Sequence, residues 1–246
     1  MTENIELIAR KSNDLIQNFE CPFTAQQQKI CMYLVAQLKP WDEGFQPLEV
    51  SVKDFCLACG IDEPGGRSYK HLEKAIQDFG FKWIKRQNGK KEALIWFKYV
   101  KIENGKITFL FNEMMTPYIL YLQNNFTKIE FDYTAKMKSK YSIRLYELLY
   151  SYYYNKFETY EFILSLNELK QKLDANYKLY TDVMKRALLP AVEEINRLTD
   201  VFVEYQPIKE GKKVAKISFT IRLKSTIERI KLAGILDEYG KPGQFS

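Results

Sequence analysis

The chain has 246 residues, of which 46% are hydrophobic and 28% charged, so it can bury one large core or two smaller ones. Its 37 Lys and Arg against 31 Asp and Glu give a net charge of +6, which permits an anionic partner without requiring one. A single histidine, His71, makes a multi-histidine metal site or a Ser-His-Asp triad hard to build. The phosphate-binding patterns G-x-x-x-x-G-K-S/T and G-x-G-x-x-G are both absent from the sequence, so we expect no cofactor and no metal.

The N-terminal segment is charged every few residues, and no apolar stretch is long enough to span a membrane. We therefore expect a cytoplasmic protein with no membrane partner. Cys56 and Cys59 form a C-x-x-C pair, but the chain has no second pair to complete a zinc site. We interpret them, with Phe55, as the buried face of a short helix, because residues three apart share a helical face.

The first half of the chain alternates between helical and extended patterns. Thr24 and Gln27 form a capping box that opens a helix, and Pro40 ends it. In chain order, the patterns predict a modest apolar helix at 5–16, a helix at 24–39, a short helix at 51–59, a helix at 67–79, and strands at 81–86, 92–100 and 106–111. The helix at 67–79 buries one hydrophobic stripe and presents a polar, cationic face on the other side.

The second half repeats this order. The patterns predict a strand at 129–133, a helix at 139–155, a short helix at 166–173, a helix at 181–198, strands at 201–206 and 214–223, and a last helix that runs into a tail. Ser165 and Glu168 form a second capping box. Pro190 should bend or split its helix. The strand at 214–223 alternates like a half-buried strand at a sheet edge, and residues 207–211 form the hairpin loop.

Helix, short helix, turn, helix and a two-stranded wing is the order of a winged helix, a variant of the helix-turn-helix. Because the order occurs twice, the sequence predicts an α+β fold of two tandem winged-helix domains. We expect an N-terminal domain at 1–127 that binds DNA, a C-terminal domain at 128–225 that is the main DNA reader, and a helix with a tail at 226–246.

Positive charge gathers in the parts of a winged helix that face DNA. Residues 67–91 contain eight Lys or Arg against two acids, and residues 178–224 contain ten against six. A Lys-rich helix face is usually ordinary solvated surface, but the same excess in the same register of both copies favours binding to double-stranded DNA.

The candidate DNA-binding residues follow from these positions. In the first domain they are Arg67, Ser68, Lys70, His71 and Lys74 on the helix, and Lys85, Arg86, Lys90 and Lys91 on the wing. In the second domain they are Tyr180, Thr181, Lys185 and Arg186 on the helix, and Lys209, Lys212 and Lys213 on the wing. Arginine suits base reading because its fork bonds O6 and N7 of guanine together, whereas lysine suits phosphate.

The chain resembles a known family over roughly residues 5–225. The most specific segment is FTKIEFDYTAKMKSKYSIRLYELL, in which the matching positions are Phe126, Thr127, Ser139, Tyr141, Arg144, Tyr146, Glu147, Leu148 and Leu149. LNELKQKL and MKRALLPAVEEIN continue the match, and FTAQQQKICMYLVAQLKP adds a weaker one. These segments are similar to the plasmid replication initiator (Rep) proteins that bind iterons, the direct repeats of a replication origin.

The resemblance implies two winged helices with pseudo-two-fold similarity and no catalytic activity. It implies monomers that bind origin iterons, open a nearby AT-rich region and recruit host replication factors. It also implies homodimers, formed through the first domain, that repress the initiator's own gene. Arg144 matches the family's arginine in the helix before the recognition helix. It either contacts phosphate or pairs with Glu147 to brace the fold.

Two alternatives remain open from the sequence. One is a winged-helix repressor with no role in replication. The other is a DNA-nicking enzyme with a tyrosine nucleophile, suggested by the run YSYYYNKFETY. That chemistry needs a metal or several His and Arg around the phosphate, which one histidine does not supply. We interpret Tyr146, Tyr150 and Tyr153 as packing residues on one helical face.

Overall fold

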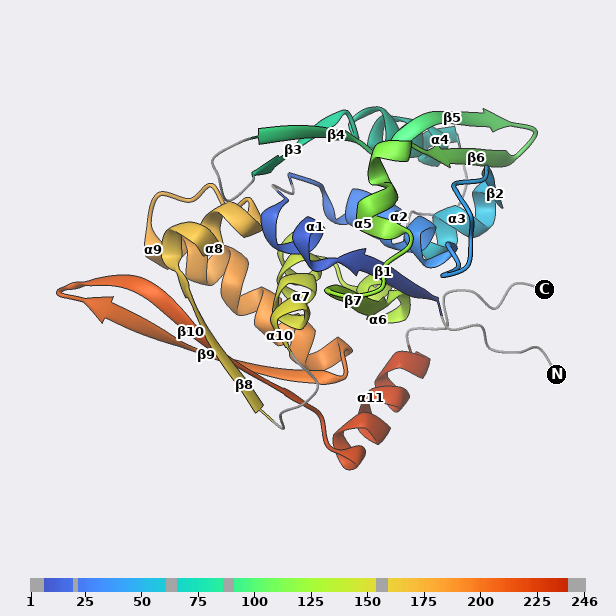
Figure 1. The fold of residues 1–246 in the computed structure, drawn as a ribbon. Helices are drawn as coiled ribbons and strands as arrows, with labels where there is room; N and C mark the ends of the chain where they lie inside the picture. The colour runs from blue at the N-terminus through green and yellow to red at the C-terminus, as the bar shows by residue number, and fades with distance from the viewer. Residues whose placement is uncertain (1–6, 20–21, 61–65, 86–90, 154–158, 239–246) are drawn as a thin grey trace. The chain divides into compact units, whose positions relative to one another are not determined.

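The computed structural model describes residues 7–19, 22–60, 66–85, 91–153 and 159–238 (Figure 1). The chain packs as two compact units, each with helices and strands. Of the described residues, the first unit contains 7–19 and 26–135, and the second contains 22–25 and 136–238. Packing thus divides the chain after Ala135, whereas the sequence predicted a boundary at 127, and it includes the last helix in the second unit.

The first unit begins with a strand rather than the expected helix at 5–16. Strand β1 (Ile8–Ser12) pairs antiparallel with β7 (Phe126–Glu130), and this long-range pairing, invisible in a local pattern, satisfies its backbone. A short helix, α1 (Asn13–Asn18), follows, with the Ser12 side chain accepting a hydrogen bond from the Leu15 amide. The strand expected at 129–133 is also wrong in part, because β7 ends at Glu130 and helix α6 (Phe131–Lys136) begins there.

Three helices of the first unit lie where the sequence predicts them. They are α2 (Ala25–Ala36), α3 (Val52–Ala58) and α4 (Gly66–Gln77). Rings from α2, α3 and β6 (Lys106–Phe111) form their shared core. Phe55 lies 5.5 Å from the Tyr33 ring and 5.3 Å from the Phe109 ring, measured between centroids. All three rings are buried, so α3 is anchored between α2 and the sheet.

The strand expected at 92–100 is two strands in two sheets. Strand β4 (Lys91–Ile95) pairs with β3 (Phe81–Lys85) as the predicted wing hairpin. Strand β5 (Phe97–Glu103) instead joins β6 and β2 (Leu48–Ser51), in the order β2-β6-β5. Trp96 separates the two strands, with its ring buried and its carbonyl accepting from the Asn112 amide at 2.9 Å. The apolar sequence at 92–100 is therefore continuous, but Trp96 pairs with neither β3 nor β6 and divides it into two strands. After β6 come η1 (Glu113–Met115) and α5 (Thr116–Ile119).

The second unit contains the predicted helices in the predicted order. They are α7 (Lys140–Tyr152), α8 (Leu166–Leu173), and a continuous helical run made of α9 (Tyr180–Val183), η2 (Met184–Leu188) and α10 (Leu189–Leu198). The capping box predicted for α8 is confirmed. The Glu168 amide donates to the Ser165 hydroxyl at 3.1 Å, and the Glu168 carboxylate accepts from the Ser165 amide at 3.0 Å.

A three-stranded antiparallel sheet completes the second unit. Its strands β8 (Thr159–Ser165), β9 (Val201–Glu210) and β10 (Lys213–Leu223) have the order β8-β10-β9. The expected edge position of β10 is therefore wrong, because β8, which the pattern did not indicate, pairs along its other side. The turn is also shorter than expected. Strand β9 continues through Pro207 to Glu210, which an edge strand tolerates, and Gly211 (φ +64°) and Lys212 make the turn.

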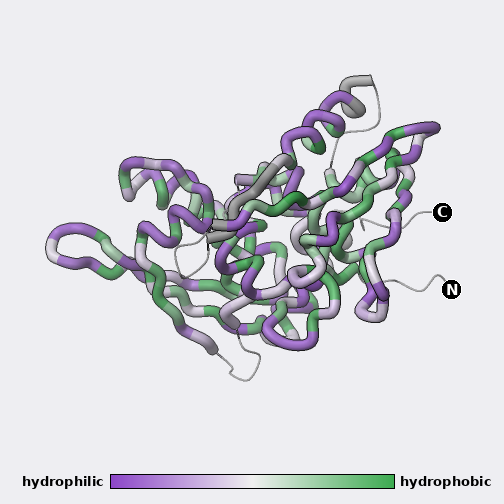
Figure 2. The backbone as a smooth tube through the Cα atoms, turned by 45° about the horizontal axis from the view of Figure 1, so that its top comes forward, coloured by the Kyte–Doolittle hydropathy of each residue, from purple (hydrophilic) through white to green (hydrophobic). Residues whose placement is uncertain are grey.

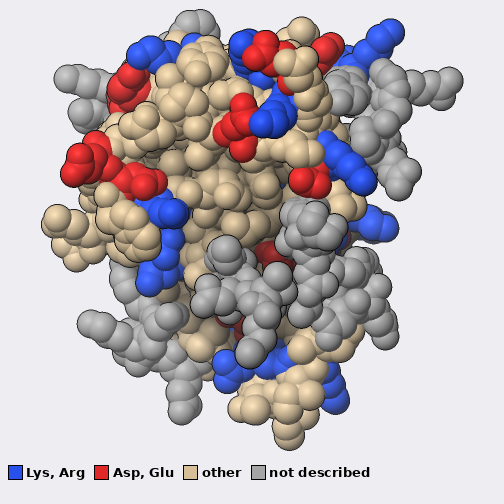
Figure 3. All heavy atoms as spheres, turned by 90° about the vertical axis from the view of Figure 1, so that its right-hand side faces the viewer, with Lys and Arg blue, Asp and Glu red and all other residues tan. Residues whose placement is uncertain are grey.

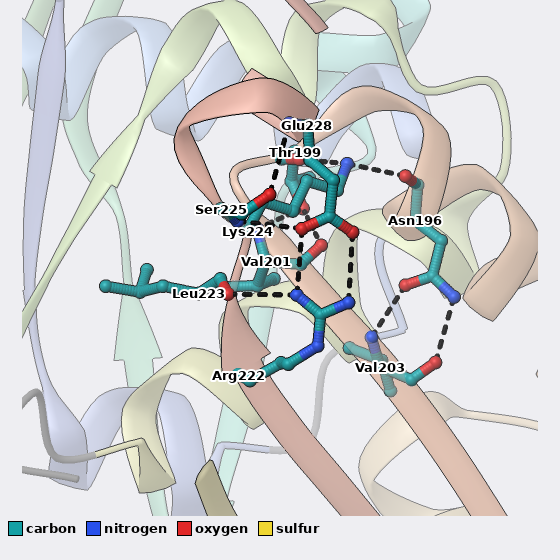
Figure 4. Close-up of polar contacts among 9 residues, drawn as sticks. All are labelled: Asn196, Thr199, Val201, Val203, Arg222, Leu223, Lys224, Ser225 and Glu228. Atoms are coloured by element: carbon teal, nitrogen blue, oxygen red, sulfur yellow. Dashed lines mark hydrogen bonds and ion pairs between the residues drawn. The ribbon is translucent and has the colours of Figure 1, made fainter. Parts of the chain in front are cut away.

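The last helix, α11 (Thr226–Glu238), is fastened to the end of the sheet by a polar cluster (Figure 4). The Arg222 guanidinium donates to both Glu228 carboxylate oxygens, each at 3.0 Å. The Lys224 ammonium donates to the carbonyls of Asn196 and Thr199, each at 2.6 Å, and so caps the C-terminal end of α10. The predicted final helix is confirmed, and these bonds hold its first turn against the end of the sheet.

We predict that Glu228→Gln loosens α11 in a pH-dependent way. Hydrogen bonds from Arg222 and Ser225 lower the pKa of Glu228 from 4.5 to about 2. A lowered pKa gives stabilisation that is present above the ordinary value and lost as the pH falls through the lowered one. The difference in melting midpoint between the native chain and the variant, followed by circular dichroism, should therefore shrink from about pH 4.5 downward. The matched control is Glu161→Gln on the exposed surface of β8, and a pH-independent difference would contradict the prediction.

Candidate nucleic-acid interface

The helical run from Tyr180 to Leu198 has one face in the core and one in solvent. Its inward residues, each with no exposed surface, are Val183, Ala187, Leu188, Ala191, Ile195 and Leu198. Thr181, Lys185 and Arg186 lie on the exposed face. Tyr180 is half-buried, and burial raises the pKa of its hydroxyl, which stays a neutral donor and acceptor. Three of the four expected helix residues are therefore exposed to solvent.

Pro190 does not split this helix. A proline has no N–H, and its ring clashes with the carbonyl four residues earlier, here that of Arg186. A π-helical turn at Met184–Leu188 ends two residues before the proline, and the helix continues as α10. A wider turn separates the ring from the carbonyl, and such turns are frequent at functional sites. Lys185 and Arg186 both lie on this widened turn.

The hairpin of β9 and β10 presents lysines at its tip. Lys209, Lys212 and Lys213 are all exposed around the turn. Glu210 forms an ion pair with Lys216 at 2.8 Å, so the acid at the turn is partly neutralised by a cation of its own. Figure 2 shows the outer end of this hairpin as hydrophilic. A wing of this kind can bring positive charge to a phosphate backbone.

In the first unit, helix α4 presents part of the expected set. Lys70, His71 and Lys74 are exposed, whereas Leu72 and Ala75 on the opposite face are buried. Arg67 and Ser68 lie in α4, and Lys85 and Lys91 lie in β3 and β4, but their side chains are outside the description. Arg86 and Lys90 fall outside the described residues altogether. The helix thus has the amphipathic register that the sequence predicts.

Several other lysines of the first unit are paired with acids. Lys98 lies 2.7 Å from Glu113, and Lys106 lies 2.5 Å from Glu49, all with exposed side chains. Figure 3 shows a face of the molecule on which Lys and Arg groups are interspersed with Asp and Glu groups. Surfaces of mixed sign do not attract a polyanion as a cationic stripe does.

Arg144 lies in the core, not at the interface. Its side chain is 2% exposed. Its Nε donates to the Lys172 carbonyl at 3.0 Å, and its Nη1 donates to the Glu147 carboxylate at 3.4 Å. It therefore joins α7 to the end of α8, the short helix of the motif. The sequence left two roles open for Arg144, a phosphate contact or a pair with Glu147 that stabilises the fold. The buried position and the contact with Glu147 are those of the second role, so the expected place of Arg144 among the DNA-binding residues is wrong.

Two residues that lie beside Arg186, Asp182 and Tyr177, were not among those predicted from the sequence. Asp182 Oδ1 lies 3.5 Å from Arg186 Nε, and the Arg186 guanidinium lies 5.8 Å from the centre of the Tyr177 ring. The i,i+4 spacing of Asp182 and Arg186 is a signal that could have indicated the pair. Tyr177 gives no such signal, because it comes from the turn before the helix.

The other groups that drew attention in the sequence belong to the core. Cys56 and Cys59 are buried on or beside α3, and burial raises the pKa of both thiols. Tyr146 and Tyr153 are buried and Tyr150 half-buried, with ring centres 5.5 Å apart for Tyr146–Tyr150 and 6.1 Å for Tyr150–Tyr153. These tyrosines pack as the sequence predicts. In the described ranges, no three His, Cys, Asp or Glu side chains gather as a metal site would require. None of the described helices is both long and apolar enough to span a membrane.

Two family models match the chain. "Initiator Replication protein, WH1" matches residues 8–150, and "Initiator Rep protein, WH2" matches residues 165–221. Among curated relatives, a "Replication initiation protein" of Escherichia coli is 24% identical over 229 residues, which is 89% of this chain and 70% of that protein. The "PI protein" of Escherichia coli is 34% identical over 141 residues, which is 50% of this chain but only 46% of that protein.

A solved structure has the same fold. It is described as "Crystal structure of Pi initiator protein in complex with iteron DNA", and it matches with a TM-score of 0.72 and 22% identity. The match covers 90% of this chain and 99% of that chain. With the two family models, it confirms the predicted α+β fold of two tandem winged-helix domains.

We predict that Arg144→Ala destabilises the protein. The change removes the guanidinium that lies 3.4 Å from the Glu147 carboxylate, which is 4% exposed, and it removes the bond to the Lys172 carbonyl, so it should lower the free energy of unfolding by about 3 kcal/mol in urea denaturation. The double variant Arg144→Met with Glu147→Gln should recover part of this loss. Lys185→Ala, on the exposed face of the helix, is the control and should change stability by less than about 0.5 kcal/mol. Unchanged stability in Arg144→Ala would contradict the brace.

Proposed function

Because the chain belongs to the family of replication initiator (Rep) proteins, we propose that it binds the iterons of a plasmid origin and starts replication there. The observation that carries the proposal is the exposed face of the helix at 180–198, where Thr181, Lys185 and Arg186 stand over a fully buried opposite face. That the related Pi initiator protein is described in complex with iteron DNA supports it.

The second unit is proposed as the main reader. Its helix enters the major groove with its N-terminal turns, as recognition helices do. In this proposal Arg186 bonds O6 and N7 of a guanine, and Lys185 meets a phosphate. Thr181 and Tyr180 offer hydroxyl groups to base edges or backbone. Lys209, Lys212 and Lys213 on the wing contact the backbone beside the groove.

The first unit is proposed as a second reader with the same design. Lys70, His71 and Lys74 on α4 face the DNA, because Leu72 and Ala75 fix the opposite face in the core. Arg67 and Ser68 on the same helix, and the wing residues Lys85, Arg86, Lys90 and Lys91, complete the proposed set. Two readers in one chain would let one molecule bind a long asymmetric site.

The remaining properties of our proposal concern partners and chemistry. The protein acts by binding and distorting DNA, without cutting it, since its tyrosine-rich helix α7 uses Tyr146 and Tyr153 in the core. It opens an AT-rich region of the origin, recruits host replication factors in the cytoplasm, and forms a homodimer through the first domain that represses its own gene. A replication role, rather than repression alone, is favoured by family membership.

The direct test is a comparison of duplexes. The native chain should bind a fragment with the direct repeats of its own plasmid origin at least about a thousandfold more tightly than an unrelated duplex of equal length, at one stated salt concentration. Fluorescence anisotropy of labelled duplexes measures both affinities. Equal affinity for the two duplexes would overturn the proposal.

We predict that Lys212→Ala weakens binding to every duplex alike. A lysine that contacts phosphate releases about one counterion, so the slope of log affinity against log salt should fall by about 1, while the ratio of specific to unrelated affinity stays constant. Anisotropy titrations over a salt series measure the slope. Lys231→Ala on the exposed surface of α11 removes the same charge away from the wing and should leave the slope unchanged. A changed affinity ratio for Lys212→Ala would mean that this residue reads sequence.

A further inference from the structure

Arg186 is held from two sides before any ligand arrives. Asp182, one helical turn earlier, lies 3.5 Å from its Nε, and the Tyr177 ring lies 5.8 Å from its guanidinium carbon. The Arg186 side chain is nevertheless 67% exposed. The guanidinium is therefore oriented by two neighbours and still open to a partner.

The Tyr177 ring is held in turn by the half-buried Tyr141 of α7. The Tyr141 hydroxyl, on α7, donates to the Tyr177 hydroxyl at 3.2 Å. The Tyr177 amide donates to the Ala175 carbonyl at 2.8 Å, within the turn between α8 and α9. Ser139 caps the start of α7 by accepting from the Tyr141 amide. Hydrogen bonds therefore connect the start of α7 to the ring beside Arg186.

These contacts are poorly suited to stabilising the fold. An exposed i,i+4 ion pair contributes little to stability, because water screens it and two flexible side chains must be ordered. The same ordering becomes useful when a ligand binds, since an arginine held beforehand loses less conformational freedom at that moment. The Asp182 carboxylate lies beside Nε of Arg186. The terminal nitrogens of a guanidinium are the atoms that bond O6 and N7 of guanine.

The Asp182 carboxylate also affects how the helix meets DNA in general. A carboxylate beside a recognition arginine repels every phosphate backbone, so it lowers affinity for all duplexes. The Asp182 carboxylate favours binding only to a duplex in which Arg186, the arginine that it orients, meets the correct base. An arrangement that sacrifices general affinity for a difference between sequences is a device for specificity.

We propose that Asp182 and Tyr177 are positioning residues that hold Arg186 for one guanine of the recognised site. The inference rests on the proposed function, because it assumes that the helix reads base sequence. Asp182 does not contact the base; it acts through Arg186.

The experiment uses the full chain and a library of duplexes with a randomised central segment. Selection with the native chain defines the preferred site, and selection with Arg186→Ala identifies the position at which guanine preference disappears. Asp182→Asn keeps the size of the side chain and removes its charge. We expect it to reduce the guanine preference at that same position by about 5- to 20-fold, and to raise affinity for unrelated duplexes. Asp182→Glu, which keeps a carboxylate within reach, should restore the preference.

The matched control is Glu193→Gln, which removes one exposed acid from α10 on the same helical run. It should raise affinity for unrelated duplexes slightly and leave every base preference intact. A second variant, Tyr177→Leu, removes the ring and should weaken the preference at the same position. Melting midpoints of all variants show that the fold is retained.

The outcomes separate the two levels of the proposal. If the native chain selects no preferred site, the proposed function fails. If it selects a site but Asp182→Asn keeps the full guanine preference, positioning by Asp182 is overturned while the function stands. If Arg186→Ala lowers affinity for all duplexes alike, Arg186 is a phosphate contact and the inference fails.

Discussion

The burial of one face of the helix at 180–198 against the core decides which of its residues can reach a ligand. Ala187, Leu188 and Ala191 have no exposed surface, so the helix cannot rotate about its axis without opening a cavity. That constraint fixes Lys185 and Arg186 on the outside. The bond from Arg144 to the end of α8 holds the short helix of the motif against α7, and α7 packs against α10.

The structure also explains how a proline is tolerated in the middle of the helix at 180–198. Pro190 removes one hydrogen bond and would crowd the Arg186 carbonyl in an ideal α-helix. The π-helical turn absorbs this conflict locally, and the helix continues to Leu198. The side chains at the widened turn therefore leave the regular 3.6-residue spacing. In this chain, the irregular turn coincides with the two cations that we propose face DNA.

Sequence periodicity was sufficient for the longer helices, but it was not sufficient for the strands or for the short helices α1 and α6. The stripe of α4, the capping box of α8 and the inward face of the helix at 180–198 are local patterns, so they could be predicted. Strand β1, the strand β8 beside β10, and the division of 92–100 at Trp96 depend on partners distant in sequence. The same limit applies to the interface. Exposed lysines follow from register, whereas the role of Arg144 and the support from Tyr177 depend on tertiary contacts.

Acids at the proposed interface are placed beside cations, which gives them a common physical role. Glu210 pairs with Lys216 across the wing, and Asp182 pairs with Arg186 on the helix. Each pair reduces the net positive charge that a duplex meets, and each orders a long side chain that would otherwise be free to rotate. A protein that had only to adhere to DNA would gain affinity by losing these acids. The position of these acids therefore supports an interface arranged to distinguish one duplex from another. In such an interface the fixed orientation of Arg186 contributes more to that distinction than the net positive charge does.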